Sequence, residues 1–154
     1  MHLIEKNLLN YNKYKILKIQ LLSFQYIKDI LELYQQLLPE ENIFLNENLL
    51  TVFKSIMNKK EYNIIIGIIN GKVITTCTLL VIPNITHNMR PYGIIENIIT
   101  HAEYRGEGYG AQVINYAKNI ALENNCHKIM VQTRRKDERV FRFYKKVGFE
   151  DNIS

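Results

Sequence analysis

Residues 93–110, Gly93-Ile-Ile-Glu-Asn-Ile-Ile-Thr-His-Ala-Glu-Tyr-Arg-Gly-Glu-Gly-Tyr-Gly110, join an apolar strand to a glycine-rich turn and the start of a helix. The strand carries one acid, Glu96, and the turn holds Arg105 and three glycines. Glycine lets the main chain adopt positive φ and lets a ligand approach without a Cβ in the way. The first N–H groups of a helix are unpaired and bind anions, and an arginine adds donors that suit phosphate oxygens. The stretch therefore predicts a pyrophosphate-binding turn at a strand-to-helix junction.

The glycines of this turn have three other possible interpretations. A phosphate-binding P-loop requires Lys followed by Ser or Thr after its last glycine, and Ala111-Gln112 stands there instead. A dinucleotide-binding fingerprint follows the first strand and is completed by an acid at the tip of the next strand. Here the turn comes late in the chain, and the next strand ends at Gln132-Thr133. A flexible turn before a helix stays open from this segment alone.

The segments downstream of the turn decide between these interpretations. Arg105-x-x-Gly108-x-Gly110 follows the strand 94–100, and it is followed by the strand 128–133 and by a helical run, 138–149, that contains Tyr-Lys-Lys-x-Gly-Phe. Together these segments resemble the acetyl-CoA-binding half of the GNAT superfamily of N-acetyltransferases, closely from Ile94 to Phe149 and loosely before that. Residues 125–130 and the Phe-Tyr-Lys-Lys-x-Gly-Phe run are similar to those of small-amine and amino-sugar acetyltransferases.

Length and composition fit a single globular domain spanning residues 1–154. The chain is 47% hydrophobic and 23% charged, which is ordinary for a soluble protein. A net charge of +5 and a pI near 9.1 favour anionic ligands, of which CoA is one. No nucleic-acid-binding module is recognisable, and we expect no nucleic-acid partner.

The chain lacks a run of the roughly 18 apolar residues that span a bilayer, and its N-terminus does not have the pattern of a signal peptide. Neither Cys77 nor Cys126 fits a disulfide framework. We therefore expect a cytoplasmic protein without a membrane partner, and no metal-ligand spacing is present.

The hydrophobic pattern predicts a mixed α/β (α+β) fold with a mostly antiparallel central sheet flanked by helices. Strands are expected at 15–22, 62–69, 72–82, 94–100 and 128–133, and helices at 23–38, 46–57, 110–124 and 138–147. Residues 83–92 are expected to form a polar loop. The spacing of apolar residues predicts two buried helix faces: Leu49, Leu50, Phe53, Ile56 and Met57 in helix 46–57, and Val113, Ile114, Ala117, Ile120 and Ala121 in helix 110–124. Ser23 and Asn46 are the expected helix caps, and Asn70-Gly71 is a two-residue hairpin signal. Strands 94–100 and 128–133, joined through a helix, should be parallel neighbours.

The resemblance implies that these two parallel strands splay apart and that the pantetheine arm of the cofactor pairs with exposed strand main chain at Ile98, Ile99 and Thr100. It also implies that the turn residues hold the pyrophosphate: Arg105, Gly106, Glu107, Gly108, Tyr109 and Gly110. Asp137 occupies a place where the superfamily more often has an Asn that touches the cofactor arm. An ionised acid cannot donate a hydrogen bond there.

The resemblance assigns Tyr144 as the acid that protonates the leaving thiolate, and a phenol of pKa near 10 suits that task. The alternative for Tyr144 is an aromatic core residue. Glu96, in an apolar strand, needs a cleft or a partner. It could accept the proton of the attacking amine, anchor that amine, or bond a neighbouring loop. His87 and His101 are weaker candidates for a proton relay.

Two further features lie near the C-terminus. Arg134, Arg135, Lys136 and Arg139 form a basic cluster that is either solvated or meets a phosphate or an acidic group of the acceptor. After Phe149 only Glu150–Ser154 remain, so the expected C-terminal strand region is short. An open sheet edge invites pairing, and either residues 1–14 or a second copy of the chain, in a homodimer, would cover it.

The sequence thus predicts an acetyl-CoA-dependent N-acetyltransferase that acts on a primary amine of a small molecule, with amino sugars and amino acid derivatives as candidate acceptors. Acetylation of a protein lysine or N-terminus and a non-catalytic acyl-CoA-binding module are the rival functions.

Overall fold

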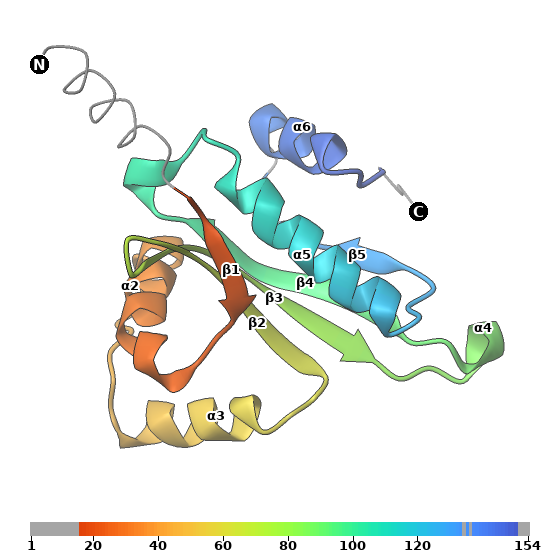
Figure 1. Ribbon diagram of the computed structural model, residues 1–154, viewed down its shortest axis with the longest axis horizontal. Coiled ribbons are helices and arrows are strands. Elements are labelled where there is room, and N and C mark those ends of the chain that lie inside the picture. Colours follow the sequence, from red (N-terminus) through yellow and green to blue (C-terminus); the bar gives the residue numbers. More distant parts are fainter. Residues whose placement is uncertain (1–15, 134, 136, 151–154) are drawn as a thin grey trace, which may run out of the picture.

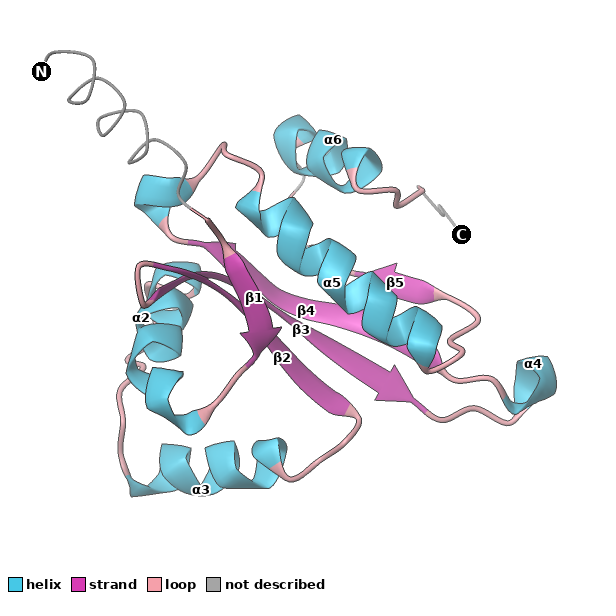
Figure 2. Cartoon of the chain, viewed as in Figure 1, coloured by secondary structure: helices cyan, strands magenta, loops and turns pink. Residues whose placement is uncertain are grey.

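The computed structural model describes residues 16–133, 135 and 137–150. Within that part of the chain, a five-stranded sheet has the order β1-β2-β3-β4-β5 (Figures 1 and 2). The strands are β1 (Lys18–Leu21), β2 (Tyr62–Ile69), β3 (Lys72–Ile82), β4 (Tyr92–Thr100) and β5 (Ile129–Val131). β1 to β4 pair antiparallel, whereas β4 and β5 pair parallel. The predicted mixed, mostly antiparallel sheet is therefore confirmed.

Helices cover both faces of this sheet, with α2 and α3 on one face and α5 on the other. The helical elements of the described chain are η1 (Phe24–Tyr26), α2 (Ile27–Leu37), α3 (Glu47–Met57), α4 (Thr86–Met89), η2 (Ala102–Tyr104), α5 (Tyr109–Glu123) and α6 (Glu138–Lys146). Figure 1 shows α6 outside the sheet, alongside α5. None of the described helices combines the length and apolarity that a bilayer crossing requires.

Two hydrophobic clusters lie on opposite faces of the sheet. On one face, Ile66 of β2 and Ile99 of β4 pack with Phe53 of α3 and with the buried side of α2. On the other face, Ile65 and Ile95 pack with α5. Because both faces are covered, β2 and β3 are buried almost along their whole length and do not alternate between buried and exposed residues. The predicted inner face of α5 is confirmed in this second cluster.

The hairpin between β2 and β3 turns at Asn70 and Gly71, as predicted. Their φ angles are 49° and 78°, which is the left-handed region that a two-residue turn requires at both positions. Asn46 is also confirmed as a cap, since its side chain accepts a hydrogen bond from the Leu49 N–H at 2.9 Å.

Four local predictions need correction. The first strand is shorter than 15–22, because only Lys18–Leu21 pairs with β2. Ser23 makes no capping bond, because the 3-10 turn η1 separates it from α2. The hydroxyl of Ser23 is buried and has no hydrogen-bond partner in the described chain. Met57, predicted to be buried, is 40% exposed at the end of α3. The predicted loop after β3 contains the short turn α4, where His87 has a φ of 54°.

β5 is also shorter than predicted, because pairing with β4 stops at Val131. Some predictions lie outside the described residues: the arm 1–14, the tail beyond Glu150, and Arg134 and Lys136 of the basic cluster.

Candidate active site

The turn between β4 and α5 has the main-chain geometry of an anion-binding turn. Gly106 and Gly108 have φ angles of 81° and 84°, and a Cβ built on either would meet no atom within 4 Å. Gly108 precedes the first residue of α5, and no side chain caps that end of the helix. The first N–H groups of α5 are therefore available for a negatively charged ligand. Their positive φ angles are the reason for glycine at positions 106 and 108, because no described atom lies close enough to exclude a Cβ.

Arg105 stabilises the shape of this turn. Its Nε donates a hydrogen bond to the main-chain oxygen of Thr100 at the end of β4, at 2.9 Å. One donor of the guanidinium group is thus used within the chain, and the side chain is exposed.

The other residues of the turn, Glu107, Tyr109 and Gly110, differ in their exposure and contacts. Tyr109 is only 9% exposed and its ring packs with Ile69 and Ile74. Burial raises the pKa of Tyr109, and a hydrogen bond between its side chain and that of Glu107 in the turn raises it further. Gly110 lets the first turn of α5 lie close to β4 and α6, because a Cβ there would lie 3.3 Å from Thr100 Oγ1 and 3.5 Å from the Phe143 ring. The remaining residue of the turn, Glu107, is exposed.

β4 and β5 separate after a short paired segment. The pairing runs from Gly93 with Ile129 to Ile95 with Val131, and no described residue of β5 pairs with the rest of β4. The predicted pantetheine contacts, Ile98, Ile99 and Thr100, lie in the other half, which pairs with β3 but has no partner among the described residues on its β5 side. We call it the unpaired half of β4. A strand edge without a partner presents N–H and C=O groups to a ligand.

A β-bulge at Asn97 marks the point of separation. Asn97 has a φ of 51°, and the register between β3 and β4 shifts at this place. As a result Ile98 packs on the α5 face and Ile99 on the α2 face. The bulge was not among the features predicted from the sequence. Its signal is the order Ile-Ile-Glu-Asn-Ile-Ile, in which apolar pairs flank an Asn, the residue type that best tolerates left-handed geometry after glycine.

Glu96 immediately precedes the bulge. It lies opposite Thr78 of β3, on the α2 face of the sheet, since its neighbour Ile95 packs on the α5 face. Its side chain is half-buried, and the ion pairs found among the described residues do not include it.

Glu96 acts electrostatically on two tyrosines. Burial raises the pKa of Tyr62, and the charge of Glu96 raises it further. Burial is also the main reason that the pKa of Tyr144 is raised; Arg135 lowers it, and Glu96 raises it. The structure thus brings the two predicted catalytic residues, Glu96 and Tyr144, within electrostatic reach of each other.

Tyr144 projects from α6 into an aromatic group. Its ring centroid lies 5.3 Å from that of Phe143 and 6.1 Å from that of Phe149, both in edge-on arrangements. The side chain is half-buried, so it packs against these rings and remains partly accessible to solvent.

Asp137 has a structural task that was not predicted from the sequence. Its Oδ1 accepts the Arg139 N–H at 2.8 Å as the cap of α6, and its Oδ2 lies 2.8 Å from Arg139 Nη2. These hydrogen bonds lower the pKa of the Asp137 carboxyl group. Contact between this acid and the cofactor arm stays a prediction.

The two histidines that were weaker candidates for a proton relay have other contacts, and both cysteines are buried. His101 Nδ1 accepts the Glu103 N–H at 3.2 Å, and His87 stacks on His127 with ring centroids 3.9 Å apart. Both cysteines are buried and free, and burial raises the pKa of Cys77 to about 12. No group of residues in the described chain has the arrangement of a metal site.

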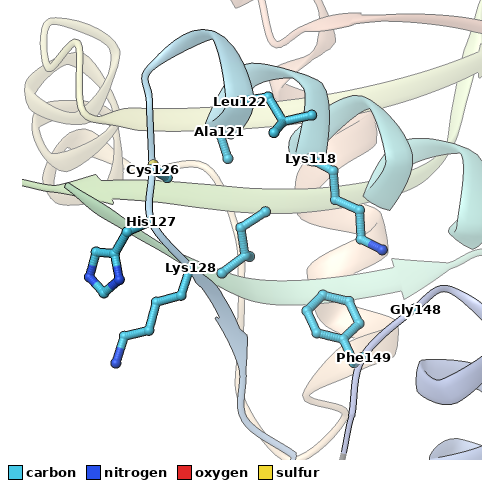
Figure 3. Close-up of a pocket in the computed structure, with 9 residues that line it drawn as sticks. Lys118, Ala121, Leu122, Cys126, His127, Lys128, Gly148 and Phe149 are labelled. Atoms are coloured by element: carbon cyan, nitrogen blue, oxygen red, sulfur yellow. The ribbon is translucent and has the colours of Figure 1, made fainter. Parts of the chain in front are cut away.

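A depression of about 270 Å³ lies at the other end of α5 (Figure 3). Lys118 and Leu122 of α5, His127 before β5, and Phe149 after α6 are among its lining residues. None of the predicted site residues lines it. The candidate active site is instead the region where the turn, the second half of β4 and α6 meet, since a Cβ on Gly110 would lie 3.3 Å from Thr100 Oγ1 and 3.5 Å from the Phe143 ring of α6.

This arrangement defines a protein of the acetyltransferase class. Residues 27–149 match the acetyltransferase (GNAT) family. The chain belongs to that family, which confirms the resemblance seen in the sequence.

Individual relatives support the same assignment. A solved structure of a proposed acetyltransferase from Agrobacterium tumefaciens str. C58 is 35% identical, with a TM-score of 0.86 over 89% of this chain and 95% of that one. A glucosamine 6-phosphate N-acetyltransferase of Trypanosoma brucei brucei is 29% identical over 79 residues, covering 51% of this chain and 52% of that protein. One of Dictyostelium discoideum is 29% identical over 122 residues, covering 77% and 74%. The chain therefore spans only about half the length of the Trypanosoma relative.

More distant solved structures share the fold alone. Glucosamine-6-phosphate N-acetyltransferase of Arabidopsis thaliana is 19% identical, with a TM-score of 0.81 over 91% of this chain and 95% of that one. An aminoglycoside N-acetyltransferase in complex with CoA is 15% identical, with a TM-score of 0.78 over 92% of each chain.

Proposed function

We propose that the protein transfers the acetyl group of acetyl-CoA to a primary amine of a small molecule. The observation that carries this proposal is the unpaired half of β4, which runs from the bulge at Asn97 to the glycine turn. A cofactor with a pyrophosphate at one end and an amide-containing arm at the other matches these two features in order. The turn would bind the pyrophosphate, and the main chain of residues 98–100 would bind the arm.

The reaction needs a base that deprotonates the ammonium group and an acid that protonates the leaving thiolate. Glu96 removes the proton of the ammonium group, directly or through water, and the neutral nitrogen attacks the thioester carbonyl carbon. As the tetrahedral intermediate collapses, the carbon–sulfur bond breaks and Tyr144 gives its proton to the departing thiolate. The nitrogen loses its remaining surplus proton to water, and the Tyr144 phenolate takes a proton back from water, so that the amide is neutral and the phenol is restored. The raised pKa of Tyr144 means that the phenol still holds this proton at neutral pH.

Direct attack by the amine is favoured over an acyl-enzyme intermediate. A cysteine nucleophile must be accessible and ionised. Cys77 is fully buried with a pKa raised to about 12, and burial also raises the pKa of Cys126. Neither thiol satisfies these two requirements.

Amino sugar phosphates are the first acceptors to test, because two relatives carry the name glucosamine 6-phosphate N-acetyltransferase. Amino acid derivatives form the second group, and peptides with a free lysine or N-terminus form the third.

The test is release of free CoA thiol from acetyl-CoA in the presence of each amine, with mass spectrometry of the product. We expect thiol release with at least one small amine and a mass gain equal to one acetyl group on its nitrogen. Transfer to peptides alone would replace the small-molecule acceptor by a protein one. Tight CoA binding without any transfer would overturn the enzymatic proposal and leave an acyl-CoA-binding module.

A further inference from the structure

The turn that is expected to hold the pyrophosphate carries a negative charge of its own. Glu107 lies between the two glycines of positive φ, its side chain is exposed, and neither ion pair formed by the described residues includes it. A carboxylate beside the first N–H groups of a helix is attracted to them in the same way as a phosphate. Glu107 is therefore an internal competitor for the groups that the cofactor would use.

In the structure this carboxylate does not occupy the free end of α5. No side chain caps that end of the helix. The Glu107 carboxylate instead accepts a hydrogen bond from the hydroxyl of Tyr109. Burial, this hydrogen bond and the charge of Glu107 all raise the pKa of Tyr109. The phenol therefore keeps its proton at neutral pH and remains the donor in this bond.

Tyr109 is a rigid anchor for the hydrogen bond. Its ring packs with Ile69 and Ile74, and only 9% of the residue is exposed. The ring of Tyr104 lies on another side, with the two centroids 6.4 Å apart. Because side chains packed in a core are held in one rotamer, the hydroxyl stays in one place. The exposed Glu107 side chain is thus the partner whose position the bond decides.

Nothing else in the described turn restrains Glu107. A Cβ at Gly106 or Gly108 would meet no atom within 4 Å, so the space on either side of Glu107 is open. Arg105 forms no ion pair with Glu107 in the described chain, and its Nε donates to a main-chain oxygen of β4. Without the hydroxyl of Tyr109, the carboxylate would be free to move to the unpaired N–H groups of α5.

We infer that Tyr109 is a positioning residue of the cofactor site, whose hydroxyl holds the Glu107 carboxylate away from the N-terminus of α5 and leaves those N–H groups to the pyrophosphate of CoA. This inference rests on the CoA binding in the proposed function. The phenol acts through Glu107, and the inference requires no contact between the phenol and the cofactor.

The test is a double-mutant cycle on CoA binding, measured by titration calorimetry. Tyr109→Phe keeps the packed ring and removes only the hydroxyl, and Glu107→Ala removes the competing carboxylate. We expect Tyr109→Phe to raise Kd for CoA about tenfold, because the released carboxylate occupies the N–H groups and repels the phosphates. Glu107→Ala should bind CoA at least as tightly as the wild type. Adding Tyr109→Phe to Glu107→Ala should then change Kd less than about twofold.

The rescue by Glu107→Ala separates this role from a structural one. If the hydroxyl of Tyr109 served only the packing of the turn, Tyr109→Phe would lose the same affinity in the Glu107→Ala background, and the inference would be overturned. Unchanged affinity in Tyr109→Phe alone would overturn it as well. Tyr116→Phe, at a half-buried position of the same helix, is the control and should bind CoA as the wild type does.

A second ligand locates the effect on the cofactor. Dephospho-CoA keeps the pyrophosphate and lacks the phosphate on the ribose. Its Kd should therefore rise in Tyr109→Phe by the same factor as that of CoA, within about twofold. An effect seen with CoA and absent with dephospho-CoA would place the carboxylate beside the ribose phosphate and overturn the assignment to the pyrophosphate.

Failure of the proposed function gives a different result. A wild-type protein that does not bind CoA would remove the proposed function and this inference together. CoA binding without acetyl transfer would remove the enzymatic proposal and leave the cycle as a valid test. A wild type and a Tyr109→Phe variant that bind CoA equally well would remove the inference alone.

Discussion

Arg105, the first residue of the glycine turn, donates a hydrogen bond of 2.9 Å from its guanidinium Nε to the main-chain oxygen of Thr100. This bond ties the start of the turn to the last residue of β4. The two regions expected to bind the pyrophosphate and the pantetheine arm are therefore mechanically linked, and Arg105 can act on cofactor affinity both through its charge and through the shape of the turn.

Replacement of Arg105 should therefore weaken cofactor binding. We expect Arg105→Ala to raise Kd for CoA about tenfold or more, because a charge-assisted phosphate contact and the bond to Thr100 are lost together. Arg105→Lys should recover only part of this, since a lysine has no planar fork. Titration calorimetry measures both values, with Lys59→Ala as an exposed control. Normal affinity in Arg105→Ala would remove Arg105 from the site.

Gly108 and Gly71 form a matched pair for testing the turn. Their φ angles are 84° and 78°, and a Cβ at either position meets nothing within 4 Å. Alanine at either position should therefore lower the free energy of unfolding by a similar amount, about 1 kcal/mol, through backbone strain. Only Gly108→Ala should also weaken CoA binding. Urea unfolding and calorimetry provide the two measurements, and equal CoA affinity in both variants would place the phosphate elsewhere.

Features that depend on a few neighbouring residues could be predicted from the sequence. The Asn70-Gly71 turn, the Asn46 cap and the inner face of α5 are of this kind, and all three are confirmed. The parallel pairing of β4 and β5 is also confirmed, since a helical crossover between two strands leaves little choice.

Features that depend on tertiary partners were not predictable in this way. The end of β5 at Val131 depends on where β4 diverges, and that depends on the bulge at Asn97. The ring of Tyr109 packs with Ile69 and Ile74 because α5 lies against β2 and β3, whereas contact between Tyr109 and the cofactor stays a prediction. The hydrogen bonds from the Gln35 side chain of α2 to the loop that follows this helix span up to 8 residues of chain and leave no periodic signal.

Tyr144 is expected to act on the chemical step and not on binding. Tyr144→Phe keeps the ring contacts with Phe143 and Phe149 and removes only the hydroxyl, so kcat should fall about 100-fold or more while Kd for CoA stays near that of the wild type. Tyr116→Phe, a half-buried tyrosine of α5, is the matched control. Unchanged turnover in Tyr144→Phe would show that Tyr144 serves only the core.

The two residues predicted as helix caps, Asn46 and Ser23, should respond to mutation in opposite directions. Asn46→Ala removes the bond to the Leu49 N–H and should lower the free energy of unfolding by about 1 kcal/mol. Ser23→Ala removes a buried hydroxyl that has no partner in the described chain, and it should raise the stability by up to about 1 kcal/mol. Chemical denaturation of both variants checks this, and a destabilised Ser23→Ala would mean that the hydroxyl has a partner after all.

Glu96 can be separated from Tyr144 by the pH dependence of catalysis. Glu96→Gln keeps the size of the side chain and cannot accept the amine's proton, so we expect a loss of about 10- to 100-fold in kcat/KM at neutral pH. As the pH rises towards the pKa of the amine, the acceptor loses its own proton and the variant should approach the wild type. A substrate anchor behaves differently, because loss of the charge would raise KM for the amine at every pH at which that amine is protonated. The pH profiles of kcat and KM for the two proteins therefore distinguish a base from an anchor, and a variant indistinguishable from the wild type at pH 7 would exclude both roles.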